Sequence, residues 1–254
     1  MMKTARFLIA ALVLGGFAIS PAFAAGNVHI ADQEWSFEGI FGTFDRAAQR
    51  RGFQVYDEVC SACHGLDFIK YRNLAALGFS EDKIKEIAAE KEVTDGPDDT
   101  GEMYDRPALP SDNVVAPFPN PQSARLANNG ALPPDLSLMV KARKNGANYL
   151  YALLTGYKDA PEGVEVTDGM YYNTAFPGHQ IAMGQPLDDD SVEFEDGAPT
   201  TLDHLAHDLV TFLAWTAEPE MEERKRLGVK VILFLIFFTA LLIAVKRKVW
   251  RDLH

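Results

Sequence analysis

The two cysteines of the chain constrain it most, because they stand at Cys60 and Cys63 with His64 directly after them. The spacing Cys-x-x-Cys-His is typical of covalent c-type haem attachment. The residues from Asp45 to Val59 favour a helix, so Cys60 and His64 are expected one turn apart on one face. Both sulfurs can then bond the vinyl-bearing edges of one porphyrin while the imidazole binds the iron. The sequence therefore predicts one covalently bound haem c.

Two other uses of the cysteines fit less well. A redox-active dithiol would stand at a helix start after a strand and would not need the histidine. A structural zinc site would need a second Cys or His pair at ligand spacing, and the sequence has none.

Several side chains compete for the second axial position of the iron. We favour Met183, because it lies in a loop punctuated by Gly and Pro (residues 176–186) that can carry a side chain across to the haem. Met139 falls in an expected helix and Met221 lies beside the C-terminal apolar segment, so packing roles suit both. The alternatives that stay open are loop methionines and a bis-histidine site: Met103, Met170, His29, His179, His204 and His207.

Both ends of the chain indicate export and membrane anchoring. Residues 1–24 predict a signal peptide, with Lys3 and Arg6 ahead of an apolar run and Ala22-Phe23-Ala24 before the cut. Residues 227–245 are apolar enough for one transmembrane helix. The basic cluster in residues 246–254 predicts a cytoplasmic tail. Residues 25–226 would then form an exported, periplasmic domain.

The fold class expected for that domain is mainly α, a c-type cytochrome domain with long loops plus the C-terminal transmembrane helix. The chain has 254 residues and is 47% hydrophobic, enough for one substantial core. Residues 94–122 are rich in Pro, Gly and Asp and predict an extended loop. No run of alternating strands is evident, and helices are expected near residues 80–91, 133–146, 147–155 and 201–215.

The chain is acidic, with a formal net charge of -12, or about -14 once the signal peptide is removed. This charge favours a basic protein partner over nucleic acid or an anionic membrane surface. Two acidic stretches can attract such a partner or be solvated loops: Asp95, Asp98, Asp99, Glu102 and Asp105, then Asp188, Asp189, Asp190, Glu193, Glu195 and Asp196.

Four separated stretches, in order, resemble the cytochrome c1 family of the ubiquinol–cytochrome c oxidoreductase (bc1) complex, of a bacterial kind. They are residues 51–56 ahead of Cys-Ser-Ala-Cys-His, residues 124–137, Phe176-Pro177-Gly178 ahead of Met183, and residues 212–226 before the anchor. The resemblance covers nearly the whole mature chain. One departure is the absence of a further cysteine pair, and Gly184-Gln185-Pro186 replaces a more proline-rich stretch.

The resemblance implies that Met183 is the distal iron ligand and that Arg125 lies near a haem propionate. It implies a subunit of a dimeric complex in the bacterial inner membrane, with cytochrome b and the Rieske iron–sulfur protein as partners. The subunit would pass electrons from the Rieske protein to a soluble basic c-type cytochrome in a respiratory or photosynthetic chain. It would contribute to an enzyme without substrate chemistry of its own.

Two other functions share most of these features. A membrane-tethered electron shuttle or an oxidase-associated cytochrome subunit would use the same haem and anchor without cytochrome b. A haem peroxidase would keep the sixth iron position open, and strong binding of carbon monoxide or peroxide would reveal it.

Overall fold

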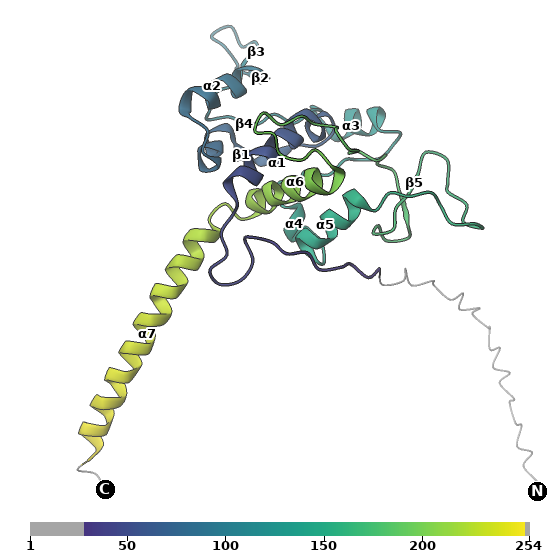
Figure 1. The fold of residues 1–254 in the computed structure, drawn as a ribbon. Helices are drawn as coiled ribbons and strands as arrows, with labels where there is room; N and C mark the ends of the chain where they lie inside the picture. The colour runs from purple at the N-terminus through teal and green to yellow at the C-terminus, as the bar shows by residue number, and fades with distance from the viewer. Residues whose placement is uncertain (1–27, 252–254) are drawn as a thin grey trace, which may run out of the picture.

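The computed structural model describes residues 28–251, in which one long helix projects away from a body of shorter helices and loops (Figure 1). The predicted signal peptide, residues 1–24, lies outside the described residues, as do residues 252–254 of the predicted tail.

A pair of packed helices, α1 (Arg46–Glu58) and α6 (Leu202–Ala217), forms the centre of the body. Asp45 caps α1 by accepting from the backbone N–H groups of Ala47 and Ala48. The two backbones approach closely at Gly52, where a Cβ would stand 2.0 Å from the carbonyl oxygen of Asp208. A side chain at residue 52 would therefore force the helices apart.

The contact between α1 and α6 buries aromatic side chains and one ionic group. Tyr56, Phe212 and Trp215 are almost fully buried. The buried carboxylate of Asp208 accepts from Arg51 Nε at 2.5 Å, and Asp196 accepts from Nη1 of the same arginine at 2.9 Å. Burying Asp208 is tolerable because the guanidinium neutralises it.

The remaining elements of the body are short. α5 (Gly146–Thr155) packs against α6, and α2 (Glu81–Ala89) packs against the 3₁₀ segment Tyr71–Leu77. The others are two 3₁₀ segments (Cys60–Ala62 and Tyr71–Leu77), β1 (Leu66–Lys70), β2 (Glu92–Asp95), β3 (Tyr104–Pro107), β4 (Asn113–Val114), α3 (Pro121–Ala127), α4 (Met139–Ala142), β5 (Tyr171–Tyr172) and β6 (Gln180–Ile181).

The mainly helical fold class is confirmed, and the helices expected near residues 80–91, 147–155 and 201–215 are α2, α5 and α6. The helix expected over 133–146 is wrong, since only α4 forms there. Residues 131–135 instead have no regular secondary structure and 136–138 form a turn, and Asp135 accepts backbone hydrogen bonds from Asp67 and Ser137. A proline also disfavours helical geometry in the residue before it, which applies to Pro133.

The sequence shows no run of alternating strands, yet short strands do form. Within residues 28–251, three antiparallel two-stranded pairs form: β1 with β4, β2 with β3, and β5 with β6. The β2–β3 hairpin and β4 occupy much of the predicted loop 94–122. Strands of two to five residues are too short to be predicted from an alternation of apolar and polar residues.

The projecting helix α7 (Met221–Trp250) contains the predicted span 227–245 and continues beyond it at both ends. Its 30 residues correspond to about 45 Å of helix. Its most apolar stretch is not buried against the rest of the described chain, whereas the apolar residues of α6 are. Length, hydropathy and exposure together favour a membrane span.

Candidate functional site: the haem attachment turn

Cys60, Cys63 and His64 lie in one tight turn at the end of α1, here called the attachment turn (residues 60–64). The helix ends at Glu58, and a single 3₁₀ turn follows. The backbone N–H groups of Cys63 and His64 donate to the carbonyl of Cys60 at 3.1 and 2.9 Å. The predicted one-turn separation of Cys60 from His64 is thus present, although the α-helix itself stops earlier.

Both cysteines are free thiols and both are half-buried. Burial raises the pKa of the Cys60 thiol to about 12, and the neighbouring Cys63 adds to the rise. Cys60 therefore stays protonated at neutral pH, as an unreacted thiol shielded from water.

The imidazole of His64 is oriented by a hydrogen bond from a distant part of the chain. Its Nδ1 lies 2.7 Å from the carbonyl oxygen of Pro134. Since a carbonyl can only accept, Nδ1 carries the proton and Nε2 keeps its lone pair available to a metal. Burial lowers the pKa of His64, although the Pro134 carbonyl and Asp135 act against the shift, so the ring is held neutral.

Pro134 is placed by a series of hydrogen bonds between the segments 64–68 and 134–137. Leu136 N–H donates to the Gly65 carbonyl at 2.9 Å, Asp67 N–H to Asp135 Oδ2 at 2.7 Å and Phe68 N–H to Ser137 Oγ at 3.2 Å. The hydroxyl of Tyr56 adds a hydrogen bond to the carbonyl of His64 at 2.9 Å. The Pro-Pro-Asp stretch thus supports the attachment turn, a role that sequence reasoning missed.

Met183 follows the β5–β6 hairpin, and residues 171–184 are here called the Met183 hairpin. The side chain of Met183 is half-buried, and its carbonyl accepts from the hydroxyl of Tyr157 at 3.0 Å. Gly184 lies against the ring of Tyr171, where a Cβ would come within 3.3 Å of ring carbon.

Asn173 connects this hairpin to α5. Its side chain is fully buried, and its Nδ2 donates to the carbonyl of Leu153 at 2.8 Å. Its Oδ1 accepts from the backbone N–H groups of Ala175 and Phe176 at 2.9 and 3.1 Å. Sequence reasoning also missed Asn173; its only signal is a polar residue inside a Tyr/Phe-rich stretch.

Arg125 lies on α3 with an exposed side chain, and its Nη1 donates to the carbonyl of Gly130 at 3.0 Å. The predicted site residues are therefore distributed over the attachment turn, α3 and the Met183 hairpin. α6 packs against both α1 and α5, which fixes the supports of the turn and of the hairpin relative to each other.

The competing histidines of the helices and loops have other partners, and the competing methionines are either packed or lie in loops. Met139 and Met221 are buried in packed positions, as expected. His179 Nδ1 lies 3.1 Å from the carbonyl of Asn173, and His207 stacks on Trp35 with ring centroids 4.7 Å apart. Other competitors are placed as follows: His204 lies 3.3 Å from Asp208, Met103 is exposed between β2 and β3, and Met170 donates its N–H to the carbonyl of Thr167.

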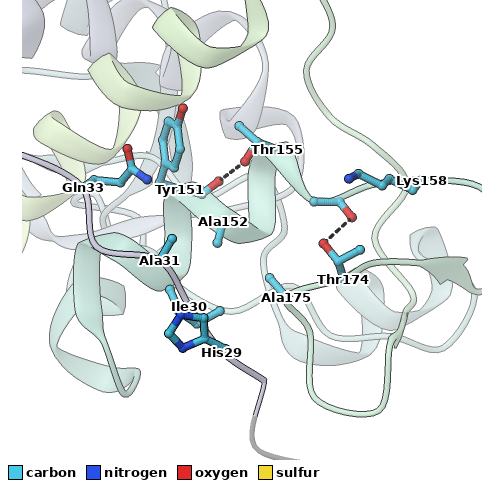
Figure 2. A pocket seen from close by; sticks show the side chains of 11 residues that line it. His29, Ile30, Ala31, Gln33, Tyr151, Ala152, Thr155, Lys158, Thr174 and Ala175 are labelled. Carbon is cyan, nitrogen blue, oxygen red and sulfur yellow. Dashed lines mark hydrogen bonds between the residues drawn. The ribbon is translucent and has the colours of Figure 1, made fainter.

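His29, the last competing histidine, lines a shallow hollow between the N-terminal segment and α5 (Figure 2). Tyr151, Ala152 and Thr155 form the α5 wall of this hollow, and Lys158 and Thr174 lie at its edge. None of the predicted haem-binding residues lines it.

The donor set fits a covalently bound haem. Two unpaired thiols, an imidazole with its Nε2 available and a methionine on a loop are the groups that such a haem uses. With the exposed helix α7, these features define a membrane-anchored c-type cytochrome.

The chain belongs to the cytochrome c1 family, whose model matches residues 35–253. Cytochrome c1 of Rhodospirillum rubrum is 50% identical over 95% of this chain and 96% of that protein. The mitochondrial cytochrome c1 haem protein of Schizosaccharomyces pombe is 49% identical over 91% of this chain and 76% of that protein. Cytochrome b/c1 of Bradyrhizobium diazoefficiens is 47% identical over 87% of this chain but only 35% of its own length.

Membership in this family gives the chain its role. It is the electron-transfer subunit of a bc1 complex, it carries a covalently bound c-type haem, and it assembles with cytochrome b and the Rieske protein. It is also a membrane-anchored protein, in agreement with the exposed apolar surface of α7.

Proposed function

We propose that the chain passes electrons from the Rieske protein to a soluble, basic c-type cytochrome in a respiratory or photosynthetic chain. It does so as part of the enzyme ubiquinol–cytochrome c oxidoreductase, and no substrate bond is made or broken on it. The observation that best supports this proposal is the hydrogen bond from His64 Nδ1 to the Pro134 carbonyl, which leaves Nε2 available beside two free thiols.

In this proposal Cys60 and Cys63 hold the haem through thioether bonds, and His64 and Met183 bind its iron. The free thiols and the tautomer of His64 support the first three assignments. The position of Met183 on a loop tied to α5 and Tyr157 supports the fourth. Arg125 faces a propionate, because its exposed guanidinium can pair with a carboxylate.

When bound, the haem supplies a one-electron couple whose potential a thioether ligand raises. The chain's own contribution is positional and electrostatic. The Pro134 carbonyl orients the His64 ring and fixes its tautomer, and burial keeps this imidazole neutral.

The acceptor is inferred from charge. The second acidic stretch is largely engaged within the fold: Asp189 accepts from the N–H of Leu202, Asp190 pairs with Thr200, and Asp196 pairs with Arg51. The first stretch is engaged in the same way, since Asp95 pairs with Arg106 and Asp105 accepts from Thr94, but both stretches expose further carboxylates: Asp99 and Glu102 in the first, Glu193 and Glu195 in the second. These carboxylates attract a basic carrier, and the attraction should weaken with salt.

The assembly and orientation rest on further support. The Bradyrhizobium relative's name joins b and c1 in one protein, which supports cytochrome b as the immediate partner. The basic residues that end α7 favour a cytoplasmic C-terminus, which places the haem domain in the periplasm of a bacterium. The complex is dimeric in this proposal.

A visible reduced-minus-oxidised spectrum of the gently purified membrane complex tests the proposal, with ubiquinol as reductant. We expect b-type and c-type haem together and inhibitor-sensitive reduction of the c haem by ubiquinol. A c-type haem alone that ubiquinol does not reduce would instead favour a tethered shuttle or an oxidase-associated subunit.

A further inference from the structure

The loop that joins Trp35 to Phe44 exposes two adjacent apolar side chains at its tip. Ile40 is 70% exposed and Phe41 is 84% exposed. For comparison, Phe237, in the middle of α7, is 69% exposed. Nothing in the described chain shields this pair, so it forms an apolar projection on the body.

The base of the loop is rigid. Trp35 and Phe44 are each 5% exposed, and Phe37 packs between them with ring centroids 5.4 and 5.3 Å away. Thr43 N–H donates to the Ser36 carbonyl at 3.0 Å, which closes the loop. The tip is consequently presented by a fixed support.

The turn at the tip depends on glycine. Gly39 has a φ of 72°, and a Cβ on Gly42 would stand 1.9 Å from the carbonyl oxygen of Glu38. Neither position accepts a larger residue without rearrangement. The fold therefore keeps this turn tight enough to project Ile40 and Phe41 together.

Both sides of the loop are fastened to the first turns of α7. Lys225 Nζ donates to the carbonyl oxygens of Phe37 and Gly42 at 2.6 and 3.1 Å. Glu222 accepts from the N–H of Phe44 at 2.8 Å and pairs with Arg46 at 2.7 Å. In Figure 1 this segment, drawn in purple before α1, descends beside the start of α7.

The depth of these contacts follows from the length of α7. Its 30 residues cover about 45 Å, close to the thickness of a bilayer with its headgroups, whereas the hydrocarbon alone is about 30 Å thick. Met221 is still buried in the body, while Leu227 begins the exposed apolar surface. Glu222 and Lys225 thus lie at headgroup level, and so does the loop that they hold.

We propose that Ile40 and Phe41 form a second membrane contact, inserted at the boundary between headgroups and acyl chains on the side that carries the haem domain. The occupant is lipid, because Lys225 ties the base of the loop to α7 two residues before the exposed apolar surface of that helix begins at Leu227, and apolar side chains bind this boundary. The contact gives the haem domain a second point of attachment to the membrane beside α7. The proposal rests on α7 spanning the membrane.

Spin labelling of the assembled complex in phosphatidylcholine nanodiscs tests it. Phe41→Cys introduces a thiol into a chain whose own two cysteines are consumed by haem attachment. Thiols of other subunits also react with the label, so the signal of the labelled unsubstituted complex is measured and subtracted. The measurement compares collisions of the label with oxygen, which concentrates in lipid, and with a water-soluble nickel chelate.

Two matched variants calibrate the result. Phe237→Cys labels the middle of α7, and Tyr104→Cys labels an exposed residue of β3, which lies far from α7 in Figure 1. We expect the oxygen-to-nickel ratio at residue 41 to exceed the ratio at 104 and to approach that at 237. Ile40→Cys repeats the test if Phe41→Cys does not accumulate.

Three results would overturn the proposal in distinguishable ways. Preferential nickel collisions at residue 41, with residue 237 in lipid, would place the loop in water. Protection of residue 41 from both reagents would show that another subunit covers it. A water-exposed label at residue 237 would remove the membrane anchor together with the loop contact.

Discussion

The attachment turn carries three reactive side chains within five consecutive residues, whereas the Met183 hairpin carries one side chain on a support spread over the chain. In the turn, the backbone hydrogen bonds to Cys60 already bring Cys63 and His64 together. The hairpin depends on contacts of Asn173 and Tyr157 with residues 20 and 26 positions away. Local sequence thus brings the three groups of one side together, although the distant Pro134 carbonyl orients His64, and tertiary packing determines the other side.

This difference separates the properties that each region should control. The attachment turn should decide whether haem is bound at all, because covalent bonds form there. The Met183 hairpin should decide the potential and stability of a haem that is already attached. Substitutions in the two regions should therefore fail in different ways.

The largest effect is expected in the attachment turn. Cys60→Ser or Cys63→Ser removes one thioether, so most of the covalently bound haem should be lost. Haem staining of the denatured chain on a gel measures it. Ser61→Ala is the matched control, since Ser61 lies between the cysteines and its hydroxyl only donates to the Asp57 carbonyl. Equal staining of the Ser61 and cysteine variants would contradict the assignment.

The next largest effect is expected in the Met183 hairpin. Met183→Leu should leave covalent haem intact but lower its reduction potential by a substantial part of the roughly 0.8 V that axial ligands span. Redox titration of the holoprotein measures the change. Met170→Leu, an equivalent exchange at another loop methionine, should leave the potential near that of the parent protein. The reverse pattern would reassign the distal ligand to Met170.

The sequence predicted the local side of the site well. The motif spacing placed Cys60, Cys63 and His64 together, and caps and hydrophobic periodicity located α2, α5 and α6. The exception is instructive: Pro133 and Pro134 resemble a helix start, yet Pro134 serves His64, 70 residues earlier in the chain. The sequence gives no signal for which side chain will donate a hydrogen bond to a proline carbonyl that lies outside a helix.

The same reason explains what was missed elsewhere. Asn173 holds the Met183 hairpin through tertiary contacts, and Lys225 binds a loop 183 residues before it. Neither contact has a periodicity or a spacing that could reveal it. Sequence patterns report which face of an element is apolar, but they do not report which loops will meet.

A smaller effect is expected from the buried support of the hairpin. Asn173→Ala removes three hydrogen bonds and should lower the free energy of unfolding by about 2–3 kcal/mol. The methionine–iron absorption band should then disappear at a lower denaturant concentration than the one at which the rest of the haem spectrum changes. Asn148→Ala, on α5 itself, is the control, because Asn148 bonds Trp35 and Asp32 instead. Equal loss of the band in both variants would show general destabilisation only.

The smallest effect concerns pH and distinguishes the two ligands by their chemistry. Burial lowers the pKa of His64 in the folded protein, whereas the imidazole has a pKa of about 6.5 in the unfolded chain. The unfolded chain therefore binds more protons below that pH. The stability that comes from neutral His64 is present above it and is lost as the pH falls through the folded pKa. Denaturant midpoints of the chain before haem attachment, in which Nε2 of His64 is free, should show this loss from pH 8 to 5, and Met183→Leu should preserve the slope, because a thioether exchanges no proton. A slope that disappears in Met183→Leu would assign the pH dependence to the hairpin and not to the attachment turn.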